Sequence, residues 1–140
     1  MRLFIDANII VDVFQKREPH FSSSYLIWRI CDMKIVDGFS SILTFSNIVY
    51  IMRKELDADK IEKLFNEISE IITFVNYRTT DAEKAAKLMK WKDFEDAIQS
   101  AIAERIKADY IITRNVKDFQ QSSVKAITPD DFIENILLSI

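Results

Sequence analysis

The chain has 140 residues, with 22 acidic and 19 basic side chains and a formal net charge of −3. This length suits one domain with a sizeable buried core, so we expect a single domain over residues 1–140. The single cysteine excludes an intramolecular disulfide, the single histidine excludes a histidine-rich metal site, and the single glycine excludes a glycine-rich phosphate loop. Any chemistry of this chain must therefore be done largely with carboxylates.

The first half of the chain alternates short apolar runs with apolar residues at helical spacing. An apolar run leads directly into Asp6, and Asp12 lies among apolar residues on the helix that follows, where we expect a solvated or hydrogen-bonded acid. Serines at 22–24 are expected to cap the second helix, and Asp57 or Asp59 the fourth. The expected elements are a strand at 3–5, a helix at 9–14, a helix at 22–32, a strand at 36–42, a helix at 44–56 and a helix at 61–68.

The second half continues the same alternation. Thr80-Asp81-Ala82-Glu83 has the form of a capping box, and Thr128-Pro129 places a proline at the first position of a last helix. The expected elements are a strand at 71–75, a helix at 80–89, a helix at 94–106, a strand at 110–112, a strand at 124–127 and a helix from 128. Strands that alternate with helices predict an α/β fold with a parallel sheet.

Polar residues stand where two of the predicted strands end. In open parallel sheets, sites lie outside the carboxyl ends of the strands. Asp6 follows the first strand, and Thr113-Arg114-Asn115 follows the strand at 110–112. Asp93 and Asp96 lie in the first turn of the most regular helix, where an acidic residue can also be a simple helix cap. The sequence thus predicts a cluster of acids at one end of the sheet.

Three motifs in this order resemble the PIN domain family of metal-dependent nucleases, which includes the VapC-type toxin ribonucleases. The resemblance covers essentially the whole chain and implies a three-layer α/β/α fold with a mostly parallel central sheet. It rests on Asp6-Ala7-Asn8, Asp93-Phe94-Glu95-Asp96-Ala97, Thr113-Arg114-Asn115-Val116-Lys117-Asp118-Phe119 and the closing Ile127-Thr128-Pro129-Asp130-Asp131-Phe132.

The resemblance also implies roles for individual residues. The family usually has a glutamate where this chain has Asn47, and an amide contributes an oxygen but no charge, which predicts weaker metal binding. The implied catalytic residues are Asp6, Asp93, Asp96 and Asp118; the implied metal ligands are Asp6, Asp96, Asn115 and Asp118; the implied supporting residues are Asn8, Thr44, Asn47 and Thr113.

Oxygen ligands alone favour Mg²⁺ or Mn²⁺ over zinc, and such a cation can activate a water for attack on a phosphodiester. Lys84, Lys87, Lys90 and Lys92 lie just before Asp93, with no Asp or Glu among residues 84–92. This run is either a phosphate track or a solvated helix face. From it and from the site motif we take Lys90, Lys92 and Arg114 as substrate-binding candidates.

The function that this pattern favours is a metal-dependent endoribonuclease acting on RNA, as the toxin of a toxin–antitoxin pair. The resemblance implies a homodimer and a small antitoxin partner. The absence of a signal peptide or membrane span predicts a cytoplasmic protein without membrane contact. Two alternatives stay open: a catalytically weak PIN-like RNA-binding or interaction module, motivated by the amides Asn47 and Asn115, and a haloacid dehalogenase-type phosphatase, which Asn8 disfavours.

Overall fold

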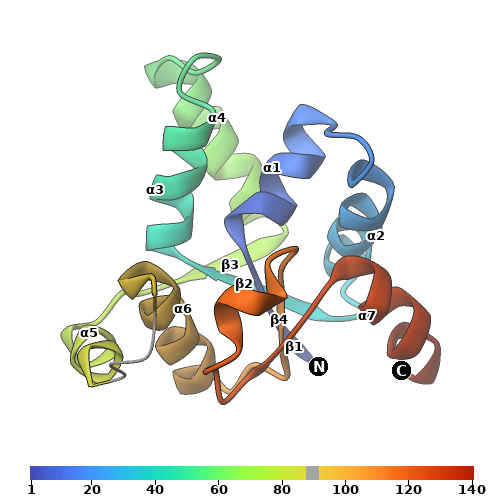
Figure 1. Cartoon of the computed structure of the whole chain (residues 1–140). Coiled ribbons are helices and arrows are strands. Elements are labelled where there is room, and N and C mark those ends of the chain that lie inside the picture. The colour runs from blue at the N-terminus through green and yellow to red at the C-terminus, as the bar shows by residue number, and fades with distance from the viewer. Residues whose placement is uncertain (88–91) are drawn as a thin grey trace.

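The computed structural model describes residues 1–87 and 92–140, and its centre is one five-stranded sheet (Figure 1). The strand order is β3-β2-β1-β4-β5, and every neighbouring pair is parallel. The strands are β1 (Arg2–Ile5), β2 (Asp37–Ser41), β3 (Ile72–Val75), β4 (Tyr110–Ile112) and β5 (Lys125–Ile127). Each bound lies within one residue of a predicted strand, and β1, β3 and β4 are the short, largely apolar runs typical of buried parallel strands.

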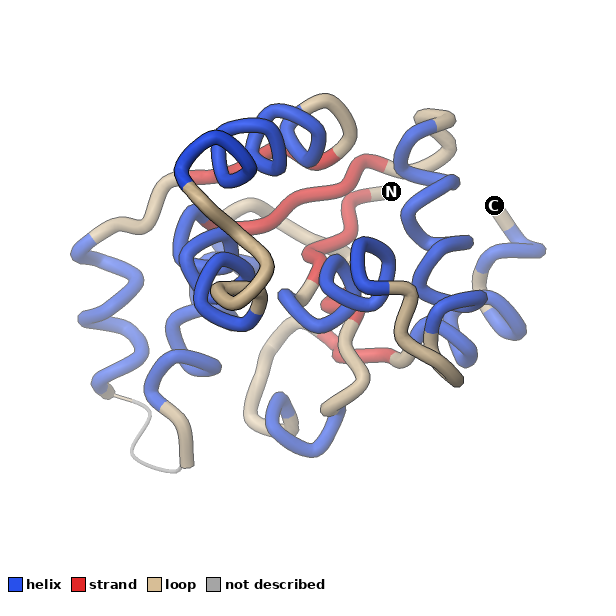
Figure 2. The backbone as a smooth tube through the Cα atoms, turned by 90° about the horizontal axis from the view of Figure 1, so that it is seen from above, coloured by secondary structure: helices blue, strands red, loops and turns tan. Residues whose placement is uncertain are grey.

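Helices cover both faces of the sheet, which confirms the three-layer α/β/α architecture (Figures 1 and 2). Alternate residues of β1 point to opposite faces, so Leu3 and Ile5 belong to one core cluster and Phe4 to the other. The first cluster is covered by α1 (Ala7–Gln15), α2 (Phe21–Asp32), α3 (Ile42–Ile51), α4 (Ala58–Ser69) and α7 (Pro129–Asn135). The second is covered by α5 (Thr79–Ala86), α6 (Phe94–Arg105) and η1 (Val116–Phe119), and the chain ends near η2 (Leu137–Ser139).

The single glycine is a packing requirement of β2. A Cβ atom at Gly38 would lie 2.5 Å from Cδ1 of Ile72 and 2.8 Å from Sγ of Cys31, both closer than van der Waals contact allows. Cys31 is buried, and burial raises the pKa of its thiol to about 12. This cysteine is therefore a neutral core side chain.

Several helix boundaries differ from their predictions. The helix expected over 44–56 is α3, which begins two residues earlier because Ser41 accepts a hydrogen bond from the Thr44 N–H, and which ends at Ile51. The serines at 22–24 do not cap α2 but lie inside its first turn, where Ser24 is buried. The Ser24 hydroxyl donates to Asp12 on α1 and does not cap α2.

The capping box of α5 is also displaced from the predicted place. The helix begins at Thr79, and the carboxylate of Asp81 accepts the N–H of Arg78 at 3.0 Å. Glu83 is not part of the capping box, because α5 begins at Thr79, one residue earlier than the Thr80–Glu83 motif predicts. The end predicted at residue 89 lies outside the described residues. By contrast, Asp57 caps α4 and Thr128 caps α7, both as predicted.

Within residues 1–87 and 92–140, no helix combines the length and the apolar character needed to cross a lipid bilayer.

Candidate active site

The order of the strands places the ends of β1 and β4 next to each other. β1 is the central strand, and the chain adds β2 and β3 on one side of it and later β4 and β5 on the other, so the strand order reverses between the parallel neighbours β1 and β4. Ile5 lies opposite Ile112 in the register, and the N–H of Asp6 donates to the Ile112 carbonyl at 3.0 Å. The residues after these two strands therefore meet at the topological switch point, as the sequence predicts.

Asp6 connects the first strand, the first helix and the segment after β4. One carboxylate oxygen accepts the Ala7 N–H at 2.8 Å and so caps α1. The other accepts the hydroxyl of Thr113 at 2.8 Å, and that hydroxyl oxygen also accepts the N–H of Asn115 at 3.0 Å. Thr113 is fully buried. It has the geometry expected of a supporting residue for Asp6 and Asn115.

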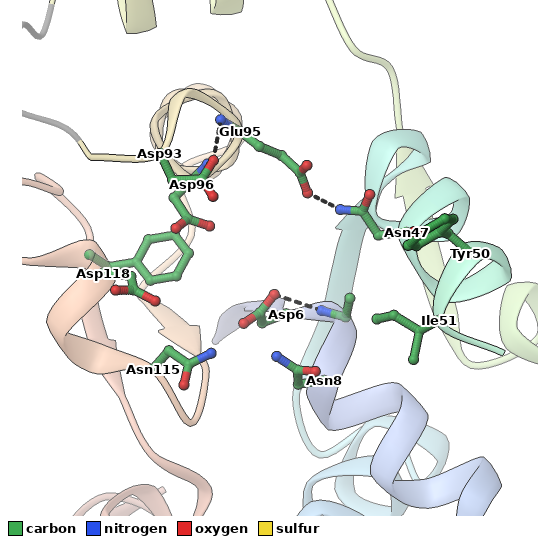
Figure 3. Close-up of a pocket in the computed structure, with 12 residues that line it drawn as sticks. Asp6, Asn8, Asn47, Tyr50, Ile51, Asp93, Glu95, Asp96, Asn115 and Asp118 are labelled. Atoms are coloured by element: carbon green, nitrogen blue, oxygen red, sulfur yellow. Dashed lines mark hydrogen bonds between the residues drawn. The ribbon is translucent and has the colours of Figure 1, made fainter.

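The start of α6 supplies three more carboxylates. Asp93 caps the helix, because its side chain accepts the N–H groups of Glu95 at 2.8 Å and Asp96 at 3.4 Å. The simple capping interpretation is thus correct for Asp93. It does not exclude a second role, since Asp93 also faces the same cavity as Asp96 (Figure 3).

These segments enclose a cavity of about 310 Å³ whose lining is rich in oxygen atoms (Figure 3). Its lining comes from Asp6 between β1 and α1, from α1, from α3, from the start of α6 and from the segment after β4. The polar lining consists of the carboxylates of Asp6, Asp93, Glu95, Asp96 and Asp118 and the amides of Asn8, Asn47 and Asn115. Every residue predicted as catalytic or as a metal ligand lines this cavity, together with the supporting residues Asn8 and Asn47.

The supporting candidate Thr44 lies away from the cavity and is fully buried. Its hydroxyl donates to the side-chain oxygen of Gln99 at 2.9 Å, which ties α3 to α6. Thr44 can therefore act on the site only by holding these two helices together.

Glu95 is a site residue that the sequence reasoning missed. Its side chain reaches from α6 toward α3 and accepts a hydrogen bond from the amide of Asn47 (Figure 3). The family usually has a glutamate where this chain has Asn47. The carboxylate of Glu95 lies beside this position. In the sequence, the only sign that Glu95 belongs to the site is its position next to Asp96. That position does not show that the start of α6 faces α3.

The electrostatics of the cavity raise the pKa of two of its acids, Asp6 and Asp96. Burial raises the pKa of Asp6, although hydrogen bonds from Thr113 and Ala7 act in the opposite direction. Burial, reinforced by the negative charge of Asp93, Asp6, Asp118 and Glu95, raises the pKa of Asp96 to about 7. Among the described lining residues there is no lysine or arginine. A cation in the cavity would offset the repulsion among these carboxylates.

The donor set fits a hard divalent cation. Carboxylate and amide oxygens are the ligands that Mg²⁺ and Mn²⁺ prefer, and no sulfur or imidazole lines the described cavity. The described acids are not gathered into a group of three or more that could hold an ion as they stand. This spacing is compatible with Mg²⁺, which usually keeps several of its waters and binds through one or two carboxylates.

A second cavity of about 390 Å³ lies on the other side of the acids. It shares Asp93, Asp96 and Asp118 with the first, and its remaining lining is Lys92, Lys117, Gln120 and Gln121. Lys92 was predicted to bind substrate; Lys117 and the two glutamines were not considered. Lys90, also predicted to bind substrate, lies outside the described residues.

Arg114, the third substrate-binding candidate, is directed elsewhere. Its Nη2 donates to Oδ1 of Asp12 at 3.1 Å, and its Nε lies 3.0 Å from Oδ2 of the same carboxylate. Arg114 does not line the acid cavity. Asp12 itself is fully buried, so it is the hydrogen-bonded acid of the two possibilities and not the solvated one.

Comparisons with known proteins agree with the fold. A family model described as PIN domain matches residues 2–117. A protein of Aquifex aeolicus (strain VF5) named Ribonuclease VapC1 is 27% identical over 137 residues, which cover 95% of this chain and 94% of that protein.

Two solved structures have the same fold. A toxin–antitoxin complex from Klebsiella pneumoniae contains a chain with a TM-score of 0.68 and 22% identity, and the match covers 91% of this chain and 97% of the other. VapBC2 from Rickettsia felis, solved bound to a DNA fragment from its promoter, contains a chain with a TM-score of 0.70 and 13% identity, covering 91% and 98%. At these identities the likeness shows a shared architecture.

Proposed function

The chain belongs to the PIN domain family, and from this premise we propose that it is a metal-dependent endoribonuclease that hydrolyses RNA phosphodiester bonds. The observation that carries the proposal is the cavity in which five carboxylates converge at the switch point of the sheet. The name of the similar Aquifex protein, Ribonuclease VapC1, supports RNA as the substrate class. The match to the PIN domain model also argues against the alternative of a haloacid dehalogenase-type phosphatase.

Mg²⁺ or Mn²⁺ is the cofactor that this donor set suits, with Asp6, Asp96, Asn115 and Asp118 as ligands and Glu95 as an additional carboxylate beside Asn47. When bound, the cation would supply the Lewis acidity that activates a water and stabilises charge on the leaving oxygen. The residues of the chain do the rest. Thr113 orients Asp6 through its hydroxyl, and Asp93 holds the first turn of α6, which carries Asp96.

The second cavity suits the phosphates next to the scissile bond. Lys92 and Lys117 line it together with three of the acids, and neither lysine belongs to an ion pair within the part of the chain that the structure describes. Unpaired cations beside a metal site attract a polyanion. Glutamine amides at 120 and 121 add hydrogen-bond donors and acceptors for RNA.

The toxin part of the proposal rests on the similar structures, which come from toxin–antitoxin complexes. We expect a small antitoxin protein as the partner and a homodimer in solution. Light scattering of the purified chain at micromolar concentration measures the mass directly, and a monomer would contradict the dimer without affecting the nuclease proposal.

The central test is a cleavage assay with single-stranded RNA and Mn²⁺ or Mg²⁺. The wild-type chain should cut the RNA, and EDTA should stop the reaction. Asp6→Asn should lower the rate at least about 100-fold, because it removes a charge at the centre of the cavity. Asp59→Asn, in the first turn of α4 at an exposed position, is the matched control and should cut like wild type.

Two results would contradict the proposal. An Asp6→Asn chain that cuts as fast as wild type would show that the activity lies elsewhere or comes from a contaminant. A wild-type chain that binds RNA but neither binds Mn²⁺ nor cleaves would favour the RNA-binding module instead.

The lysine assignment has its own test in the salt dependence of RNA binding. Lys117→Gln in the inactive Asp6→Asn background should reduce the slope of log affinity against log salt by about 0.7, the value for one phosphate contact on a single strand. Lys63→Gln on α4, whose side chain is 79% exposed, should leave the slope unchanged. Equal slopes for both variants would remove Lys117 from the RNA contact.

A further inference from the structure

A buried ion pair lies beside the acid cavity but outside its lining. The side chain of Asp12 is 0% exposed and that of Arg114 is 25% exposed, and Nε lies 3.0 Å from Oδ2. The alignment of Nε is poor for a hydrogen bond, whereas Nη2 donates to Oδ1 at 3.1 Å. Both oxygens of one buried carboxylate are therefore held by one guanidinium.

A third segment joins this pair through α2. The hydroxyl of Ser24, which is fully buried, donates to Oδ2 of Asp12 at 3.0 Å. The three residues come from α1, from α2 and from the segment after β4. The ion pair therefore connects elements that are far apart in the sequence.

Stability alone is a weak reason for such an arrangement. Removing two charges from water costs about as much as their attraction returns, and neutral replacements of a buried pair are often tolerated. The best-attested use of buried ionic groups is to specify one geometry out of several. The question is then which geometry the Asp12–Arg114 pair specifies.

The pair is the second of two links between the same two segments. Asp6 caps α1, and Asp12 lies six residues later on the same helix. Thr113 donates to Asp6, and the next residue, Arg114, binds Asp12. The Thr113 N–H, which donates to the Ile127 carbonyl at 3.1 Å, and the Thr113 hydroxyl, which donates to Asp6, hold the start of the segment after β4, and the Arg114–Asp12 contact adds a second point along α1 that fixes the orientation of the residues that follow.

The segment held in this way carries two of the residues in the acid cavity. Asn115 follows Arg114 directly, its N–H donates to the Thr113 hydroxyl, and the Asp118 N–H donates to the Asn115 carbonyl at 2.9 Å. Both Asn115 and Asp118 line the cavity that Asp6 also lines. A small rotation of residues 113–118 would change the distances among these oxygens.

We propose that Asp12 and Arg114, supported by Ser24, are positioning residues that hold Asn115 and Asp118 in register with Asp6 for metal binding. The proposal rests on the proposed function for the identity of the ligand, but the geometry it describes exists without it. The role assigned to Arg114 is to hold the site together, in place of a direct contact with RNA.

The test uses a neutral double variant, Asp12→Asn with Arg114→Met, which leaves no charge unpaired in the interior. Asn at 12 can still accept the Ser24 hydroxyl. The chain contains a matched control, the pair of Asp81 and Arg105, with side chains 3% and 23% exposed and Nε 3.0 Å from Oδ1. Asp81→Asn with Arg105→Met likewise keeps an oxygen for the Arg78 N–H and lies outside the cavity lining.

Two measurements are made on each folded variant: Mn²⁺ affinity by calorimetry and hydrogen exchange of the amides of Asn115 and Asp118 without metal. The Asp12/Arg114 variant should bind Mn²⁺ at least about 10-fold more weakly, as is typical when groups that orient metal ligands are lost. Its two amides should exchange at least about 10-fold faster. The Asp81/Arg105 variant should match wild type in both measurements.

Wild-type affinity and exchange in the Asp12/Arg114 variant would overturn the proposal, as would equal losses in both double variants. If the wild-type chain binds no Mn²⁺, the proposed function fails, and the exchange rates still decide whether the pair holds residues 113–118.

If the double variant does not fold, Arg114→Lys replaces it, because lysine keeps the charge but cannot hold both oxygens with one planar group. Weaker Mn²⁺ binding is expected there too, and unchanged affinity and exchange would overturn the proposal.

Discussion

Asp6 caps the start of helix α1, and Asp12 lies within the same helix. These two aspartates have different partners in the fold. Asp12, near the end, is fully buried and has its charge balanced by Arg114. Asp6, at the start, receives hydrogen bonds from Thr113 and the Ala7 N–H but belongs to no ion pair among the described residues. It faces other acids instead of a cation.

This difference separates an acid whose charge the chain balances from one that has no ion-pair partner among the described residues. A buried charge that is paired within the chain requires no external counter-ion. A charge placed among like charges lowers the stability of the folded chain unless a cation binds beside it. Burial raises the pKa of Asp6 accordingly. Sequence reasoning placed Asp6 directly after the first strand and Asp12 on the helix that follows, but only their partners show which of them has its charge balanced.

The largest effect should come from removing one member of the neutralised pair. Asp12→Ala leaves the Arg114 charge unpaired in a mostly buried place, so we expect the free energy of unfolding to fall by about 3 kcal/mol. Urea denaturation of the metal-free protein measures it. Asp32→Ala breaks the exposed Arg29–Asp32 pair and should cost at most about 1 kcal/mol. Similar losses for both would mean that the burial of Asp12 has no special importance.

At the other end of α1, Asp6→Asn should not destabilise the metal-free protein, because it removes an unbalanced charge and asparagine still caps a helix. The variant should instead lose stabilisation by metal. Mn²⁺ at about 100 times its dissociation constant should raise the wild-type free energy of unfolding by about 2.7 kcal/mol. Thermal melts with and without Mn²⁺ check this, and an equal Mn²⁺ effect on the variant would show that Asp6 is not a ligand.

The next effect is on pH dependence. The pKa of Asp96 rises from 3.8 to about 7 in the folded chain, so the folded state binds this proton more tightly than the unfolded state. The stability that follows is complete below about pH 4 and is lost as the pH rises through 7. Metal-free Asp96→Asn should therefore show a flatter profile than wild type between pH 4 and 7, measured by urea denaturation in EDTA.

Metal binding should follow the opposite direction, because the proton on Asp96 competes with the cation. With a pKa of about 7, Mn²⁺ affinity should be roughly 10-fold higher at pH 8 than at pH 6. Calorimetry at both values measures it, and an affinity that does not change with pH would remove Asp96 from the ligand set.

The smallest effect concerns the residue that sequence reasoning missed. The charge of Glu95 raises the pKa of Asp96, but less than the charge of Asp93 does. Glu95→Gln should therefore lower the pKa of Asp96 slightly, and Asp93→Asn should lower it more. A carbon-detected NMR titration of the side-chain carboxyl groups resolves the order. A larger shift for Glu95→Gln would place Glu95 closer to the centre of the site than Asp93.

Much of the fold could be read from local patterns. All five strands lie at predicted positions, although β2 is mostly polar in sequence, and helices α4, α6 and α7 are capped by Asp57, one of the two acids expected there, by Asp93 and by Thr128. The errors came from side chains with tertiary partners. Ser24 was taken for a cap but binds Asp12, and Asp81 displaces the capping box of α5 while it also binds Arg105.

The candidate site was predicted to a similar degree. The rule for parallel sheets brings Asp6 and Asn115 together from their positions after β1 and β4, and the helix start adds Asp93 and Asp96. The supporting roles of Thr44 and Asn47 depend on their contacts across the gap between α3 and α6. Such contacts join residues about 50 positions apart, and no local pattern contains them.

The sequence by itself determined that a set of acids would meet at one end of a parallel sheet, because strand ends and helix starts follow from local apolar spacing and capping. Only the tertiary structure decided which acids stay unbalanced. Asp6 and Asp12 look alike along the chain, and the difference between them comes from Arg114, more than 100 residues away. The charge state of a buried acid depends on its neighbours in space, and packing alone supplies them.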